Sequence, residues 1–177
     1  MMAETLSVSA FAGPAVLLCL VASLAPQEAP GVSADAARVA RFVGEWEAQV
    51  LFPGAPPVAG RSRVRALEGG AWVVEDFEAE MQGAPFRGHG LFGWDRTRNQ
   101  YASVWVDNME GKLTTGSGAW DERAGAFVLR AEIDMGEGPV RLRETWRLRG
   151  RDAFTFTMAP DQDGAEAVMT IEYARKK

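Results

Sequence analysis

Three carboxylates share otherwise apolar faces of alternating segments, and they are the residues of this 177-residue chain best placed to do chemistry. Successive side chains of a β-strand point to opposite faces, so each acid is expected beside its apolar partners inside the fold. The three sets are Glu75 with Val73, Phe77 and Met81, Asp107 with Tyr101, Ser103, Trp105 and Met109, and Glu144 with Val140, Leu142, Trp146 and Leu148. A carboxyl group that enters an apolar interior needs a partner or becomes neutral, with its pKa raised.

This pattern predicts a ligand pocket with aromatic walls and a few acidic contacts. The residues that we expect to contact a ligand are Glu75, Phe77, Tyr101, Trp105, Asp107 and Glu144. The same pattern also fits a structural role, in which each acid is paired with an arginine or a hydroxyl group or lies at an open rim. On the opposite faces, residues such as Arg141, Arg143, Arg147 and Arg149 are expected to form a solvated surface.

Several motifs match known sites by letter but lack the necessary context. Residues 88–93, GHGLFG, fit the dinucleotide pattern G-x-G-x-x-G, but they lie inside an expected strand instead of opening a helix. Residues 161–164 start like a calcium loop that lacks its later ligands. The single histidine, His89, could ligate a haem iron only if a bulge turned it inward, and its alternation places it on the solvent face. We therefore expect no catalytic residue, metal or cofactor.

The N-terminal segment is typical of a secretory leader. Residues 10–25 are apolar and uncharged, although the preceding residues carry Glu4 and no Lys or Arg. We expect residues 1–34 to be a signal peptide and linker, and residues 35–177 to be one secreted or periplasmic domain without a stable membrane span. The only cysteine, Cys19, lies in the leader, so disulfides and thiol chemistry are excluded from the mature domain. Scattered basic residues and a net charge of −5 make nucleic acid an unsuitable partner.

The rest of the chain predicts an antiparallel β-meander. Asp35 can cap a short helix over 36–43, and after Gly44 the pattern changes to a period of two. Turn residues, including a Pro/Gly-rich loop over 53–60, separate short runs with β-forming composition. After the strand that begins near Trp46, these runs lie near 61–68, 71–81, 86–94, 100–107, 113–120, 126–134, 140–149, 153–159 and 166–175. We expect an all-β barrel of about 8–10 strands with a short N-terminal helix, because closure removes both exposed edges.

A family resemblance rests on particular motifs. The helix leading into Gly44-Glu45-Trp46, the meander and the terminal Tyr173-Ala174-Arg175 resemble the lipocalin-like, or calycin, superfamily. Residues 90–95 (GLFGWD), 101–107 (YASVWVD) and 118–121 (GAWD) resemble a bacterial family known as domain of unknown function 1579. The resemblance implies a structural role for Gly44, Trp46 and Arg175, with the Trp46 indole packed against Arg175. The loop over 53–60 is too short for the helical lid of fatty-acid-binding relatives.

Three functions fit these features. The first is a barrel that binds a small, largely apolar molecule, whose polar end would be neutral or cationic because the interior contacts are acidic. The second is an enzyme that uses Glu75, Asp107 or Glu144 as general acid or base, which requires two of them close together. The third is an interaction scaffold with a packed barrel and its function on loops such as 53–60.

Overall fold

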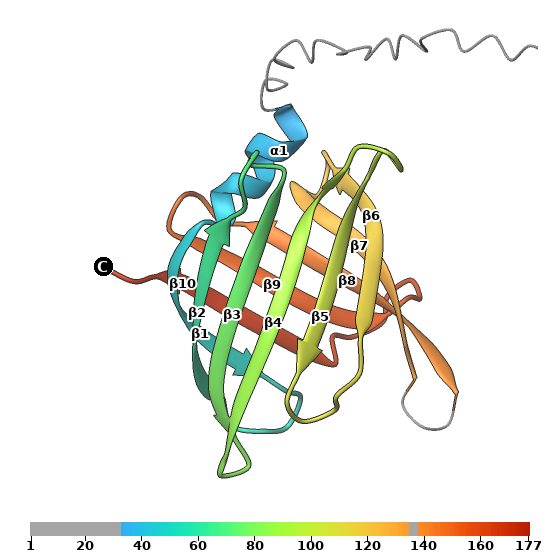
Figure 1. Ribbon diagram of the computed structural model, residues 1–177. Helices are drawn as coiled ribbons and strands as arrows, with labels where there is room; N and C mark the ends of the chain where they lie inside the picture. Colours follow the sequence, from blue (N-terminus) through green and yellow to red (C-terminus); the bar gives the residue numbers. More distant parts are fainter. Residues whose placement is uncertain (1–32, 135–137) are drawn as a thin grey trace, which may run out of the picture.

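The structure is a computed structural model that describes residues 33–134 and 138–177, and it confirms the all-β expectation. Ten antiparallel strands close into one barrel in sequence order (Figure 1), with β10 completing the ring against β1. Two short helical segments precede them, α1 (Ala34–Val39) and the 3₁₀ turn η1 (Ala40–Phe42). The strands are β1 (Gly44–Leu51), β2 (Val58–Ala66), β3 (Trp72–Met81), β4 (Ala84–Asp95), β5 (Gln100–Asp107), β6 (Thr114–Asp121), β7 (Ala126–Asp134), β8 (Pro139–Leu148), β9 (Ala153–Pro160) and β10 (Met169–Arg175).

Some element boundaries differ from those expected. β2 begins at Val58, so the expected loop over 53–60 is shorter because its last residues pair with β1. The helix begins at Ala34, and the side chain of Ser33, not of Asp35, accepts a hydrogen bond from the Ala36 backbone N–H at 3.2 Å. Residues 1–32 of the predicted leader lie outside the described residues. Within the described part of the chain, no helix is long and apolar enough to span a membrane.

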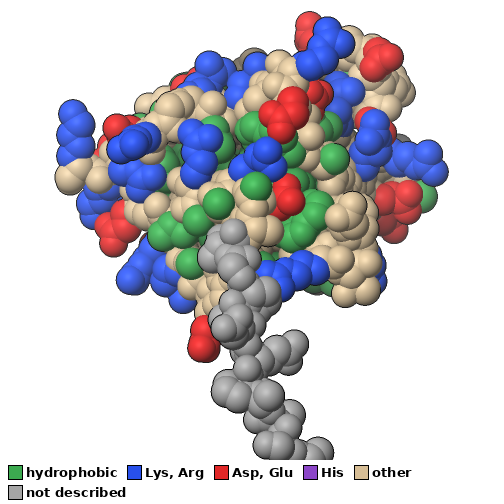
Figure 2. All heavy atoms as spheres, turned by 90° about the horizontal axis from the view of Figure 1, so that it is seen from above, with side chains coloured by type: hydrophobic (Ala, Val, Ile, Leu, Met, Phe, Trp, Pro, Cys, Tyr) green, Lys and Arg blue, Asp and Glu red, His purple; other side chains and the backbone are tan. Residues whose placement is uncertain are grey.

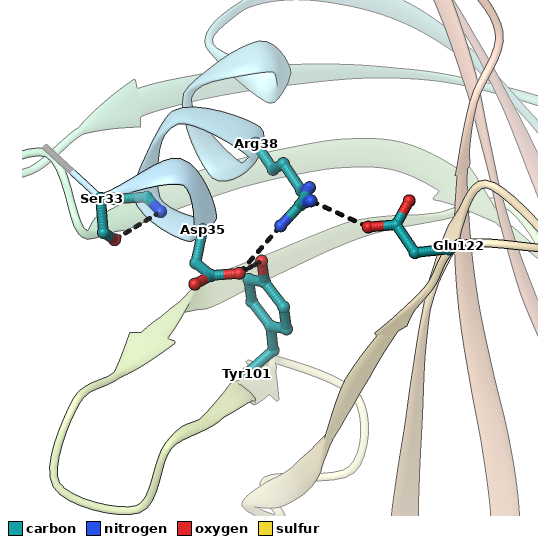
Figure 3. A network of polar contacts seen from close by, with 6 residues as sticks. Ser33, Asp35, Arg38, Tyr101 and Glu122 are labelled. Carbon is teal, nitrogen blue, oxygen red and sulfur yellow. Dashed lines mark hydrogen bonds and ion pairs between the residues drawn. The ribbon is translucent and has the colours of Figure 1, made fainter.

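The helical segment covers one end of the barrel (Figure 1). Phe42 packs its ring against Phe92, Phe127 and Phe154, at centroid distances of 4.9–5.7 Å. A polar network holds α1 in place (Figure 3): Tyr101 donates a hydrogen bond to Asp35 at 2.7 Å, and Arg38 pairs with both Asp35 and Glu122. Seen from this end, acidic and basic side chains are interspersed around the molecule (Figure 2).

The two ends of the barrel differ in packing. At the α1 end, the inward side chains are almost fully buried and mainly aromatic: Trp46, Phe92, Tyr101, Phe127, Phe154 and Tyr173. At the opposite end, where β1 ends and β2 begins, inward apolar residues such as Met81 and Met158 remain half-buried. We call this end the mouth. Strand alternation therefore yields a barrel that is firmly closed at the α1 end and less completely filled at the mouth.

Candidate functional site

Glu144 enters the barrel from β8 and is 4% exposed. Its carboxylate reaches Ser103 on β5, whose hydroxyl donates a hydrogen bond to Glu144 Oε2 at 3.0 Å. Between them lies Gly116 of β6, where a Cβ atom would come within 2.6 Å of the Ser103 hydroxyl and 2.8 Å of Glu144 Oε2. Glycine at this position therefore creates the space for the pair. Burial raises the pKa of Glu144 to about 7, against the opposing effect of the Ser103 hydrogen bond.

Glu75 forms a second acidic centre from β3. Its Oε1 atom accepts hydrogen bonds from Ser62 on β2 at 2.6 Å and from Tyr173 on β10 at 3.2 Å. Both hydroxyl residues are buried, and Glu75 itself keeps intermediate exposure. Burial raises the pKa of Glu75, while the two hydrogen bonds lower it. Burial also raises the pKa of the Tyr173 hydroxyl, and the neighbouring Glu75 adds to that effect.

Trp105 forms an aromatic wall next to Glu75. Its indole lies across β4 over Gly88 and Gly90, and a Cβ atom at Gly88 would overlap the ring. The Trp105 ring also contacts Phe77 at a centroid distance of 6.4 Å and stacks on Phe86 at 6.5 Å. The motif GHGLFG lies inside β4, as expected, and its first two glycines accommodate the indole.

The mouth is lined by flexible apolar side chains. Met81, Met158 and Met169 are half-buried at the strand ends on this side, beside Phe86 and Trp105. Exposed large hydrophobic residues continue this surface onto the surrounding strand ends and loops: Phe52, Val106, Met109, Leu113, Val140 and Val168. Because methionine is unbranched and has three rotatable bonds, such a lining can rearrange around different shapes at low cost.

The other two residues expected at a ligand site lie at opposite ends of the barrel. Asp107 is at the rim, where it accepts hydrogen bonds from the backbone N–H groups of Met109 and Glu110 and from the Trp105 indole N–H. Tyr101 lies at the α1 end and is 1% exposed. Burial and the Asp35 carboxylate raise the pKa of the Tyr101 hydroxyl to about 12. In these contacts Asp107 holds the turn after β5 and Tyr101 holds α1.

His89, which we expected on the solvent face, lies on the outer surface of the barrel. His89 is exposed and lies 3.0 Å from Asp76, so it does not enter the barrel. Hydrogen bonds from Arg65 and then His89 lower the pKa of Asp76. Within residues 33–134 and 138–177, no group of three His, Cys, Asp or Glu residues could hold a metal ion.

The hydroxyl partners of the acids were not identified from the sequence. Ser62 alternates with Val64 and Tyr173 with Ile171, so strand parity could have placed them inside. The contact of Ser62 with Glu75 depends on the register of the β2–β3 hairpin, and the contact of Tyr173 depends on the pairing of β10 with β1 that closes the barrel. Among the described residues, neither Glu75 nor Glu144 has a cationic side chain within salt-bridge distance, and no hydrogen bond joins the two acids. The site can therefore stabilise hydrogen-bond donors or positive charge.

The closed meander and the N-terminal cap define a lipocalin-like β-barrel fold. The family model described as "Protein of unknown function (DUF1579)" matches residues 33–175, and the chain belongs to this family. No match was found among curated proteins.

Solved structures share the barrel at low sequence identity. The S-type phycobiliprotein lyase CPES from Guillardia theta is 12% identical with a TM-score of 0.52, covering 80% of this chain and 92% of the lyase. A de novo designed fluorescence-activating beta barrel is 17% identical with a TM-score of 0.45, covering 81% of this chain and 100% of the design. A redesigned beta barrel is 11% identical with a TM-score of 0.43, covering 78% and 95%.

Proposed function

We propose that this protein binds a small, largely apolar molecule inside the barrel, through the mouth opposite α1. The observation that carries this proposal is the pair of interior acids, Glu75 and Glu144, which have hydroxyl partners but no cation among the described residues. They lie behind a half-buried lining of methionine and aromatic side chains. A closed barrel of this kind can hold one small ligand in its interior.

The acids favour a ligand whose polar end donates hydrogen bonds or carries positive charge. A buried carboxylate without a counter-charge is costly, so the empty site retains a proton on Glu144 until the pH reaches about 7. An ammonium or similar group would replace that proton and stabilise the ionised form. An anionic end, such as a fatty-acid carboxylate, would instead add like charge.

The apolar part of the ligand would lie against Trp105 and Phe77. The Trp105 ring is half-buried, so it has surface left to cover, and Phe77 supports it from behind. Displacement of Met81, Met158 or Met169 would enlarge the space, because methionine side chains change rotamer readily. We expect the barrel to accept several related ligands of similar length.

Export to the periplasm or the medium remains part of this proposal. It is supported by the apolar, uncharged run over residues 10–25. Fractionation of cells that express the full chain tests it, with the intact mass of the recovered protein reporting removal of the leader. Full-length protein confined to the cytoplasm would contradict export without affecting the binding proposal.

The binding proposal is tested by titration with a matched series of ligands: dodecylamine, dodecanol and dodecanoate, each below its micelle concentration. Tryptophan fluorescence reports binding, because Trp105 lies beside Glu75 in the interior. We expect affinity in the order amine, alcohol, carboxylate, and a loss of amine preference in Glu144→Gln. The control is Glu172→Gln, an exposed acid on the outer face of β10. Equal affinity for the three ligands, or no binding of any, would contradict the proposal.

A further inference from the structure

A second hollow lies on the outer surface of the barrel, separate from the interior. It runs along β8 and β9, which are at the back of the barrel in Figure 1, and its volume is about 290 Å³. Its charged lining consists of Arg143, Arg147 and Arg149, and the segment after β9 adds Ala165 and Ala167 as a wall. Outward side chains of β8 alternate with the inward Glu144, so this hollow and the interior site use opposite faces of one strand.

The floor of this hollow is polar and recessed. Thr145 pairs in register with Thr157, and Arg147 pairs with Thr155. Thr155 points away from the barrel interior and is nevertheless only 9% exposed, because surrounding side chains cover it. Within the described residues, the hydroxyls of these three threonines make no hydrogen bond that would occupy them. They are thus available to donate to a ligand.

Among the residues that the structure describes, the arginines of the hollow lack acidic partners, unlike their neighbours on the same sheet. Arg130 pairs with Asp161 at 2.9 Å, and Arg141 lies 3.8 Å from Glu132. Among residues 33–134 and 138–177, no carboxylate lies within 4.0 Å of the guanidinium groups of Arg143, Arg147 or Arg149. Arg143 donates a hydrogen bond to the Gln162 backbone carbonyl at 3.3 Å. Among the described residues, the groove therefore presents three guanidinium groups without a carboxylate partner around these hydroxyl groups, and Glu172, the register partner of Thr155 on β10, is an adjoining acid.

We propose that this outer groove, formed by Arg143, Thr145, Arg147, Arg149, Thr155 and Thr157, binds a ligand that carries more than one phosphate group. Guanidinium groups bind phosphate oxygens through paired, charge-assisted hydrogen bonds, and hydroxyl donors can satisfy the remaining oxygens. At about 3.3 Å per residue along a strand, Arg147 and Arg149 are separated by roughly 7 Å and Arg143 and Arg147 by roughly 13 Å. A single phosphate cannot contact all three, so an extended ligand fits better.

The groove is distinct from the surrounding solvated surface in its shape as well as its charge. Arg61 and Arg63 on the outer face of β2 are also exposed and form no ion pair among the described residues, but they do not line this groove. They provide a control, because replacing them removes the same formal charge from a part of the outer surface outside the groove. Their register partners are acidic, Glu47 and Glu78 for Arg61 and Glu45 and Asp76 for Arg63, whereas those of Arg147 are Ala126 and Thr155. A loss of binding in both double variants would indicate attraction that depends on net charge alone.

The test is calorimetric titration with tripolyphosphate, in parallel with sedimentation on vesicles of phosphatidylcholine containing phosphatidylinositol bisphosphate, whose headgroup carries several phosphate groups. The proteins compared are the native chain, Arg147→Gln/Arg149→Gln and the control Arg61→Gln/Arg63→Gln. We expect the groove variant to weaken binding at least about tenfold, since two charge-assisted contacts to phosphate are lost, and the control to change it less than about twofold.

The outcomes separate a free phosphate from a lipid headgroup. Groove-dependent binding of tripolyphosphate supports a soluble ligand, and groove-dependent binding to vesicles alone supports a headgroup. Binding to neither, or an equal loss in both double variants, overturns the proposal. Dodecylamine binding should be unchanged in the groove variant, so the interior site and the outer groove succeed or fail independently.

Discussion

Arg175 covers the indole of Trp46, with its guanidinium carbon 4.1 Å from the ring centroid, and the two residues are direct partners in the pairing of β10 with β1. Arg175 also donates hydrogen bonds to the backbone carbonyls of Val43 and Arg151. The contact expected from the lipocalin-like resemblance is thus confirmed. Gly44 makes it possible, because a Cβ atom there would overlap the guanidinium, and its φ of 150° also favours glycine.

Replacing Arg175 should reduce stability without changing ligand preference. Arg175→Met removes a partly desolvated cation–π contact worth about 0.5–2 kcal/mol together with its backbone hydrogen bonds. We expect a loss of about 2 kcal/mol in the free energy of unfolding, measured by urea denaturation. The control, Lys176→Met, removes an exposed ion pair with Glu45 and should cost less than about 1 kcal/mol. Equal losses in both variants would show that the contact with Trp46 stabilises the fold no more than an exposed ion pair does.

The stability of the unliganded protein should fall as the pH rises from about 4.5 to above 7. Burial raises the folded-state pKa of Glu144 to about 7, so the folded state holds a proton that the unfolded state releases at lower pH. The stabilisation is complete below the unfolded pKa and is lost as the pH passes through the folded value, on the order of 3 kcal/mol in total. Thermal unfolding across this range should show a clearly smaller slope for Glu144→Gln than for Glu172→Gln. Identical slopes would contradict the burial of an uncompensated acid.

Removing the hydroxyl of Ser103 should leave Glu144 without its hydrogen-bond partner. We expect Ser103→Ala to destabilise the protein by about 1–3 kcal/mol, because a buried polar group loses its only donor among the described residues. The pKa of Glu144 should rise further, since that hydrogen bond lowers it. Carboxyl chemical shifts followed by NMR against pH measure this directly. Ser117→Ala, on the exposed face of β6, serves as control, and an unchanged Glu144 titration in Ser103→Ala would refute the pairing.

The two glycines beneath Trp105 should respond differently to alanine. A Cβ atom at Gly88 would overlap the indole, whereas at Gly90 its nearest atom is Trp105 Cε3 at 3.3 Å. We expect Gly88→Ala to displace the ring, shift its fluorescence and cost about 1–3 kcal/mol, which is typical of overpacking. Gly90→Ala should cost less because a small movement of Trp105 relieves the contact. A larger loss of stability in Gly90→Ala than in Gly88→Ala would contradict this position of the Trp105 indole.

The strands and the inward acids could be predicted because they depend on local alternation. Glu75 and Glu144 do face the interior, as parity indicates, and Trp46 and Arg175 meet as the resemblance implies. Asp107 also follows parity, but it is the last residue of its strand, and the next turn uses its carboxylate. Parity assigns a face and does not show whether a strand end lies inside the barrel or at its rim.

The partners of the acids could not be predicted from local pattern, because they arise from register and closure. Ser62 and Tyr173 reach Glu75 from strands that pair on either side of β1, and Ser103 meets Glu144 across the space left by Gly116. The predicted helix cap was wrong because two nearby residues, Ser33 and Asp35, are both good capping residues. Ser33 caps the helix, while Asp35 is used by Tyr101 and Arg38.

The most direct test of the interior binding site is native mass spectrometry of the protein purified without denaturation from the cells that produce it. The measurement compares the native chain with the double variant Glu75→Gln/Glu144→Gln. We predict a complex with one small molecule for the native chain and a loss of that species in the double variant, because the two carboxyl groups hold its polar end. A native chain without a bound molecule, or an equal amount of the same complex in the double variant, would contradict this account.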